Sequence, residues 1–143
     1  MLEHTADLRL KVFGKTLEEL FCNAVLALAC VLKESCEKDV EKCELNEQVT
    51  VRATNVNALL VDFLNEVLSK SYINKVIFPH CYFTISPSDL DKVASSGIFL
   101  LKGEICGIKV DGFDEDVKAV TYHEVDIKKD KKGIWQTTLV LDI

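Results

Sequence analysis

Alternation of apolar and polar residues in the second half of the chain places the strongest limit on its fold. Residues 117–128 and 134–143 show this two-residue period, and residues 76–85 and 97–110 are two further predicted strands. Turn-forming residues separate them, at 87–89, 111–112 and 130–133. A two-residue period puts one face of a strand on the core, and short turns reverse the chain direction. The pattern therefore predicts an antiparallel meander.

The first half of the chain predicts two more strands and two helices. Segments 4–14 and 43–53 alternate and are predicted strands. Thr16 and Glu19 have the spacing of a capping box, and apolar residues then recur at helical spacing to Leu32. Asn55 precedes a second helical pattern over residues 56–68. We expect an α+β fold, a two-layer sandwich with two helices packed on one face of a largely antiparallel sheet of about six strands.

Length, charge and hydrophobicity limit the class of protein. A chain of 143 residues can bury a core of its own, so we expect a single domain over residues 1–143. The formal net charge of -6 disfavours capture of a nucleic-acid backbone or an anionic membrane. The sequence shows no membrane-spanning apolar run and no secretory signal pattern. We expect a soluble protein of the cytoplasm, or of the cytoplasm and nucleus.

Cysteine usage gives little indication of metal or redox chemistry. The six cysteines, at 22, 30, 36, 43, 81 and 106, form no Cys-x-x-Cys motif. Cys22 and Cys30 lie within the apolar run of the first helix, where cysteine acts as a small hydrophobic residue. We therefore expect buried, reduced thiols.

Acidic residues near the two ends of the sequence form the candidate site. Asp7 lies on the polar face of the first predicted strand, and Asp142 lies on the more polar face of the last, directly before Ile143. If these strands meet, Asp7, Asp142 and the terminal carboxylate of Ile143 would offer about three to five hard oxygen ligands. Such a set suits calcium, magnesium or manganese. Solvated acids at a strand end are the alternative.

Other polar residues allow weaker hypotheses. Asp62 and Glu66 lie one helical turn apart and could share a cation or acid–base chemistry, or simply face solvent. His4 and His123 fall on the apolar faces of their predicted strands, where they could approach each other as structural residues. The acidic segment 111–116 lacks the arrangement of an EF-hand and is predicted to be a solvated loop.

Several motifs, in this order along the chain, resemble the archease family. They are His4-Thr5-Ala6-Asp7, the helix entry at 14–21, residues 59–66, the run 117–123, and the closing Leu141-Asp142-Ile143. The resemblance implies a chaperone-like accessory protein that activates the GTP- and manganese-dependent RtcB-type RNA ligase in tRNA splicing. It also implies that Asp7, Asp142 and Ile143 hold a metal ion, with calcium favoured over magnesium or manganese. The expected partner is the ligase or its complex, with no stable direct binding to nucleic acid and none to a membrane.

Two functions of other classes are the alternatives. The sequence shows no nucleophile with a recognisable adjacent base and no phosphate-binding loop, so we expect no enzyme activity. A metal-dependent phosphoester hydrolase would use Asp7, Asp142, Asp62 and Glu66. A small RNA-binding module would use Tyr122 and the basic tip at 128–132. Arg9, Lys11 and the loops at 33–44 and 87–96 depart from the family pattern, which leaves the fit to a ligase surface undefined.

Overall fold

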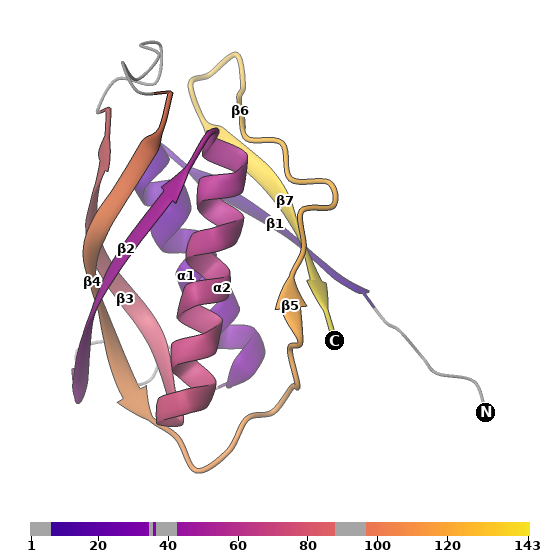
Figure 1. Ribbon diagram of the computed structural model, residues 1–143. Coiled ribbons are helices and arrows are strands. Elements are labelled where there is room, and N and C mark those ends of the chain that lie inside the picture. Colours follow the sequence, from indigo (N-terminus) through magenta and orange to yellow (C-terminus); the bar gives the residue numbers. More distant parts are fainter. Residues whose placement is uncertain (1–6, 35, 37–42, 88–96) are drawn as a thin grey trace.

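Two helices lie between two antiparallel sheets in the computed structural model, which describes residues 7–34, 36, 43–87 and 97–143 (Figure 1). The elements follow the chain in this order: β1 (Asp7–Gly14), α1 (Leu17–Leu32), β2 (Leu45–Ala53), α2 (Val56–Asn74), β3 (Val76–Ser86), β4 (Phe99–Lys109), β5 (Ala119–Val120), β6 (Lys128–Lys129) and β7 (Trp135–Asp142).

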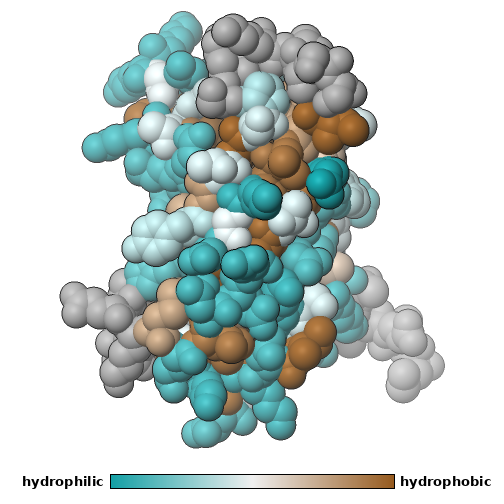
Figure 2. All heavy atoms as spheres, turned by 60° about the vertical axis from the view of Figure 1, so that its left-hand side comes forward, coloured by the Kyte–Doolittle hydropathy of each residue, from teal (hydrophilic) through white to brown (hydrophobic). Residues whose placement is uncertain are grey.

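The strands divide into two sheets that do not share a strand. One sheet has the order β1-β7-β5, with β6 also paired to β7, and the other has the order β2-β4-β3. All pairings are antiparallel. Figure 2 brings the side of the β2-β4-β3 sheet toward the viewer, and hydrophilic side chains cover much of this face. The sheet therefore turns its apolar residues toward the helices and its polar residues outward.

The two helices begin where the sequence predicts. The Thr16 hydroxyl accepts a hydrogen bond from the Glu19 amide at 3.1 Å, and the Asn55 side chain accepts one from the Ala58 amide at 2.8 Å. These caps satisfy amide groups that the first helical turn leaves without partners. α2 continues to Asn74 rather than ending near residue 68. Its added turn carries Tyr72, which is hydrogen-bonded to the main chain of Val117.

Both helices contact both sheets, and this arrangement places the core. α1 packs against β1 and β3, while α2 packs against β2, β4 and β5. Phe21 of α1, Phe63 of α2 and Phe83 of β3 form an aromatic cluster, with ring centroids 5.6 to 6.3 Å apart. The expected α+β class with two helices and antiparallel strands is confirmed. The single sheet with helices on one face is corrected to one sheet on each side of the helices, because α2 buries residues on more than one side.

The strand predicted over residues 117–128 is largely irregular. Only β5 and β6 are strands, and between them Glu124 adopts a left-handed conformation with φ 61°. The Thr121 hydroxyl donates to the Val140 carbonyl at 3.0 Å and lies 3.3 Å from the His123 amide, which donates to it. The bond between His123 and Thr121 is local and competes with a strand ladder. His123 is exposed, so its predicted place on an apolar face is wrong; His4 lies outside the described residues.

The prediction of six reduced cysteines is also wrong for four of them. Cys30 is bonded to Cys36 and Cys43 to Cys106, with Cα atoms 5.1 and 5.3 Å apart. Cys22 and Cys81 keep free thiols. Sequence spacing gave no indication of these pairs, because Cys43 and Cys106 approach each other only through the pairing of β2 with β4. In the part of the chain that the structure describes, no helix has the length and apolarity to cross a membrane.

Candidate functional site

The pairing of β1 with β7 brings Asp7 and Asp142 directly opposite each other. β1 begins at Asp7, β7 ends at Asp142, and the antiparallel register makes these two residues partners. Figure 1 shows the end of β7 beside the start of β1, near the C-terminus. The sequence segments that are farthest apart in the chain therefore meet at one end of this sheet.

Both acidic side chains lie on the outer face of the sheet. Residues directly opposite each other in an antiparallel pair point to the same face, with Cβ atoms about 4.5 to 5.5 Å apart. Asp7 is exposed and Asp142 is half-buried, while Leu8 and Leu10 of β1 pack against the core from the opposite face. The predicted assignment of Asp7 to the polar face is confirmed. Two like charges placed opposite each other repel, which destabilises the pair unless a cation or proton intervenes.

The main chain of Asp142 is fixed from both sides. β1 pairs with it on one side, and Ala119 of β5 is its partner on the other. The Lys118 amide donates to the Asp142 carbonyl at 2.7 Å. β7 is thus an inner strand at this point, and its position is set by two neighbours.

Asn65 of α2 holds β5 in place by two hydrogen bonds. Its side-chain nitrogen donates to the Val120 carbonyl at 2.8 Å, and its side-chain oxygen accepts from the Val120 amide at 2.9 Å. The sequence did not predict a role for Asn65, although this residue lies inside the 59–66 motif, between Asp62 and Glu66. A side-chain amide among apolar helix residues could have indicated this role, because a half-buried polar side chain requires hydrogen-bond partners.

Ile143 follows Asp142 and packs its side chain against the core. This packing restrains the main chain at the end of β7, beside the two acids. The Ile143 main chain thus follows directly after the acid that ends β7.

Asp7 and Asp142 carry carboxylate oxygens, the hard ligand type that calcium and magnesium prefer. Among the residues that the structure describes, no hydrogen bond or ion pair engages the carboxylates of Asp7 and Asp142. The described residues contain no group of three or more His, Cys, Asp or Glu side chains that could hold a metal ion. Carboxylate pairs supplemented by main-chain oxygens and water are typical of calcium sites. The acid pair is thus compatible with calcium, provided that further ligands come from the main chain and solvent.

Asp62 and Glu66 of α2 do not join this pair. The Tyr122 hydroxyl donates a hydrogen bond to the Asp62 carboxylate, and Lys70 forms an ion pair with Glu66 at 3.6 Å. The hydrogen bond to Asp62 raises the pKa of Tyr122, and burial and the negative charge of Asp62 add to this effect. Four carboxylates acting together, as the hydrolase alternative requires, are not assembled in the described part of the molecule.

The basic tip has partners within the chain. Lys128 forms an ion pair with Asp126 at 3.0 Å, and the Lys129 ammonium lies 5.5 Å from the centre of the Trp135 ring. Tyr122, which the RNA-binding alternative would use, donates its hydroxyl hydrogen to Asp62. These contacts engage Lys128, Lys129 and Tyr122 within the chain, whereas Lys131 and Lys132 of the tip are exposed.

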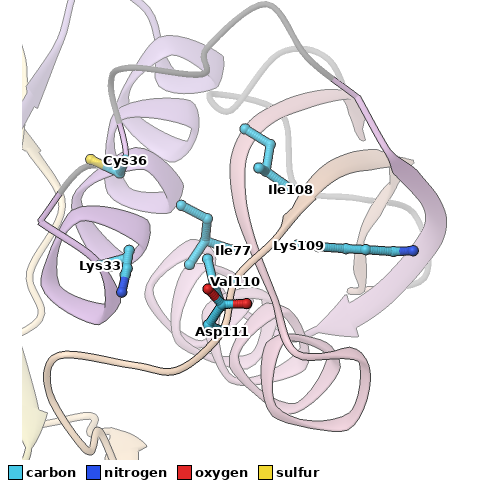
Figure 3. A pocket seen from close by; sticks show the side chains of 7 residues that line it. All are labelled: Lys33, Cys36, Ile77, Ile108, Lys109, Val110 and Asp111. Carbon is cyan, nitrogen blue, oxygen red and sulfur yellow. The ribbon is translucent and has the colours of Figure 1, made fainter.

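A separate cavity lies where α1 approaches the ends of β3 and β4 (Figure 3). Its volume is about 170 Å³. Lys33 also reaches Asp114 at 3.5 Å, and Figure 3 shows the Lys109 side chain directed away from the other labelled residues. No residue predicted for the functional site lines this cavity, whose lining residues are Lys33, Cys36, Ile77, Ile108, Lys109, Val110 and Asp111.

The fold and the acid pair define a small α+β protein in which two helices lie between two antiparallel sheets and two acids face each other on the first and last strands. The model of the Archease protein family (MTH1598/TM1083) matches residues 1–143, and the chain belongs to this family. Its similarity extends to the protein archease of Methanosarcina mazei, 33% identical over 144 residues that cover 99% of this chain and 93% of the relative. The archease of Pyrococcus furiosus is 34% identical over 145 residues, which cover 99% of this chain and 95% of the relative.

Solved structures share the fold. The solution structure of Methanobacterium thermoautotrophicum protein 1598 has a TM-score of 0.70 and 25% identity, covering 99% of this chain and 96% of the other. A crystal structure of an archease from Thermotoga maritima, described as a possible chaperone, has a TM-score of 0.60 and 17% identity, covering 100% of this chain and 95% of the other. At this identity, the similarity to the Thermotoga maritima structure concerns the fold alone.

Proposed function

We propose that this protein is a non-enzymatic accessory factor that activates an RtcB-type RNA ligase, the GTP- and manganese-dependent enzyme of tRNA splicing. Membership of the archease family supports this class of function. The observation that carries the proposal is the register of β1 on β7, which places Asp7 opposite Asp142 on an outer face.

In this proposal Asp7, Asp142 and a main-chain oxygen of Ile143 hold one divalent cation, calcium in preference to magnesium or manganese. Calcium accepts irregular sets of oxygen ligands, whereas magnesium demands near-octahedral geometry. The cation would neutralise two carboxylates that otherwise repel each other across the strand pair. Asn65 and β5 hold the main chain of Asp142, one of the two acids, in place.

Asp7, Asp142 and Ile143 form what we call the acidic tip, which is distinct from the basic tip at 128–132. In our proposal the acidic tip would act on the ligase by differential binding. A surface that binds one state of a partner more tightly than another shifts the partner toward that state. We propose that the tip enters the metal-rich active site of the ligase and favours either guanylylation of its histidine or release after turnover. The chemistry then belongs to the ligase, and this chain contributes shape and charge.

The decisive experiment compares Asp7→Asn and Asp142→Asn with Asp111→Asn in ligation assays. All three changes remove one charge from an aspartate, and Asp111 is exposed outside the tip. Under multiple turnover, the two tip variants should lose stimulation of ligation by about 10-fold or more, because a first ligand to the metal is lost. Asp111→Asn should stimulate fully, and single-turnover ligation should proceed without the accessory protein. Full stimulation by a folded Asp7→Asn or Asp142→Asn protein would refute the proposed tip.

Incubation of the protein alone with phosphoester substrates and magnesium or manganese tests the hydrolase alternative. The accessory function predicts no turnover above the rate of the buffer. Turnover that disappears in the Asp142→Asn variant would replace our proposal with an enzymatic one.

A further inference from the structure

The two free cysteines of the chain lie in contact. Cys22 of α1 and Cys81 of β3 have their Sγ atoms 2.8 Å apart, and the Cys22 thiol also approaches the Cys81 carbonyl oxygen at 3.5 Å. A disulfide bond has an S–S length of about 2.05 Å, so closure requires the sulfur atoms to move together by less than about 1 Å. The four remaining cysteines are already paired in disulfides.

The packing around this pair keeps the two sulfur atoms together. α1 packs along β3, and the rings of Phe21, which precedes Cys22, and Phe83, two residues after Cys81, have centroids 5.8 Å apart. Side chains in such a core occupy defined rotamers and hold their neighbours in position. The approach of Cys22 to Cys81 is thus built into the contact between a helix and a sheet, away from the Asp7 and Asp142 pair.

The two thiols differ in access and in acidity. Cys22 is half-buried, whereas Cys81 is buried with 8% of its surface exposed. The hydrogen bond with Cys81 lowers the pKa of Cys22, and the same bond, together with burial, raises the pKa of Cys81. Because the thiolate is the attacking species, a dissolved reagent should react at Cys22 first.

We propose that Cys22 and Cys81 are a redox-active thiol pair, which a low-molecular-mass disulfide of the glutathione class converts into a disulfide bond between α1 and β3. The Cys22 thiolate attacks one sulfur of the dissolved disulfide, forms a mixed disulfide, and releases one thiolate. Cys81 then gives up its proton and attacks the Cys22 sulfur, and the second thiol leaves. Two protein thiols are oxidised to one disulfide, while the dissolved disulfide is reduced to two thiols.

This bond would change the stability of the molecule without using the proposed metal site. It would join residues 59 positions apart in the sequence and link α1 directly to the β2-β4-β3 sheet. A crosslink over a loop of this length restricts the unfolded chain, and the expected gain is a rise in melting temperature on the order of 10 °C.

Peptide mapping under non-reducing conditions tests the proposal on the unmodified protein. The folded chain is equilibrated in glutathione buffers of increasing disulfide content, blocked with iodoacetamide and digested with trypsin. Cleavage after Lys and Arg gives peptide 16–33 with Cys22 and Cys30, peptide 34–38 with Cys36, and peptide 76–92 with Cys81. Before oxidation, peptide 16–33 should carry only peptide 34–38. After oxidation, the three peptides should remain joined, and the intact mass of a sample taken before blocking should be lower by about 2 Da, as two hydrogens are lost.

Two serine variants provide matched controls. In Cys81→Ser, Cys22 should stop at the glutathione mixed disulfide, because no second thiol is present to displace it. In Cys22→Ser, the buried Cys81 should stay unmodified under the same buffers. The proposal is overturned if the wild-type protein accumulates the mixed disulfide at Cys22 without joining peptide 76–92, or if that joining occurs only after unfolding in urea.

Discussion

Asp114 shows how a single exposed carboxylate ties a loop to the end of a helix. Its side chain accepts a hydrogen bond from the Glu34 amide at 2.8 Å and lies 3.5 Å from the Lys33 ammonium, while its own amide donates to the Leu32 carbonyl at 2.8 Å. The last carbonyl groups of a helix lack partners within the helix, so these contacts complete the end of α1. The acidic segment at 111–116, predicted to be a solvated loop, thus also docks on a helix.

The charge of Asp114 should make part of the stability depend on pH. The hydrogen bond from the Glu34 amide lowers its pKa in the folded state, and the nearby Lys33 charge acts in the same direction. A carboxylate with a depressed folded pKa stabilises the fold above its unfolded pKa, near 3.9, and this contribution is lost as the pH falls through the folded value. Asp114→Asn should therefore lower the free energy of unfolding at pH 7 and have a smaller effect near pH 3.

Urea denaturation at the two pH values measures this difference, with Asp111→Asn as the control for loss of an exposed charge in the same loop. If Asp114→Asn lowers the free energy of unfolding equally at both pH values, the Asp114 charge is not the cause of the loss.

The residue-level predictions from sequence succeeded where a periodic pattern fixes the face of a strand. Asp7 and Asp142 lie on outer faces as alternation predicted. The prediction for His123 was wrong, because its amide bonds to the Thr121 hydroxyl two residues away, where the predicted strand is interrupted. Asn65 was not found, because its role depends on the position of Val120, which is 55 residues away in the sequence.

At the scale of elements, Gly14 controls the connection from β1 to α1. A Cβ atom at this position would clash with the Leu20 amide nitrogen and would lie 2.8 Å from the Thr16 carbonyl oxygen. Both are main-chain atoms of the first turn of α1, which cannot rotate aside as a flexible side chain could. The short connection thus requires the absence of a side chain where the strand meets the helix.

Gly14→Ala should destabilise the protein by about 2 kcal/mol or more, because the helix must shift away from the strand to admit a methyl group. Denaturation curves in urea report the change. Gly112→Ala is the matched control, since an added Cβ there meets nothing within 4 Å. Equal stability of both variants would mean that the connection between β1 and α1 adapts easily.

Asn65 links a helix to the strand that flanks the candidate site. Asn65→Leu keeps a similar volume but leaves the Val120 amide and carbonyl without their hydrogen-bond partners. The expected loss is about 2 kcal/mol of unfolding free energy, because unsatisfied buried groups carry a desolvation cost. Asn74→Leu, which removes an amide bonded to Lys70 within the same helix, serves as the control. Unchanged stability of Asn65→Leu would show that the hydrogen bonds from Asn65 to Val120 do not hold β5 in place.

The elements themselves were largely predictable, and their partners were not. Caps and apolar spacing predicted where both helices begin, alternation predicted β1, β2 and β7, and strand-like runs between turn residues predicted β3 and β4. Alternation identifies the buried face of a strand but not the strand beside it, so the division into two sheets could not be derived. The strongest indication of two sheets came from α2. Its consecutive residues Leu59, Leu60 and Val61 are all buried, as expected for a helix covered on two sides.

At the scale of the whole molecule, the proposed cation site would connect the ends of the chain. β1 and β7 contribute one acid each, and β7 is the strand to which β5 and β6 also pair. An ion held by Asp7 and Asp142 binds the folded chain, whereas the unfolded chain separates these residues by 135 positions, the difference between their numbers. Binding energy of this kind appears directly as stability of the folded state.

Calcium should therefore raise the melting temperature of the wild-type protein. A ligand at about 100 times its dissociation constant stabilises the folded state by about 2.7 kcal/mol, which corresponds to a rise of several degrees for a chain of this size. The net charge of -6 makes a general salt effect a competing cause, so sodium chloride at matched ionic strength is the reference. Asp142→Asn should abolish the calcium-specific rise, and Asp111→Asn should retain it. A rise of equal size in all three proteins would place the ion elsewhere on the surface, because only a site that includes Asp142 can lose its calcium dependence with that carboxylate.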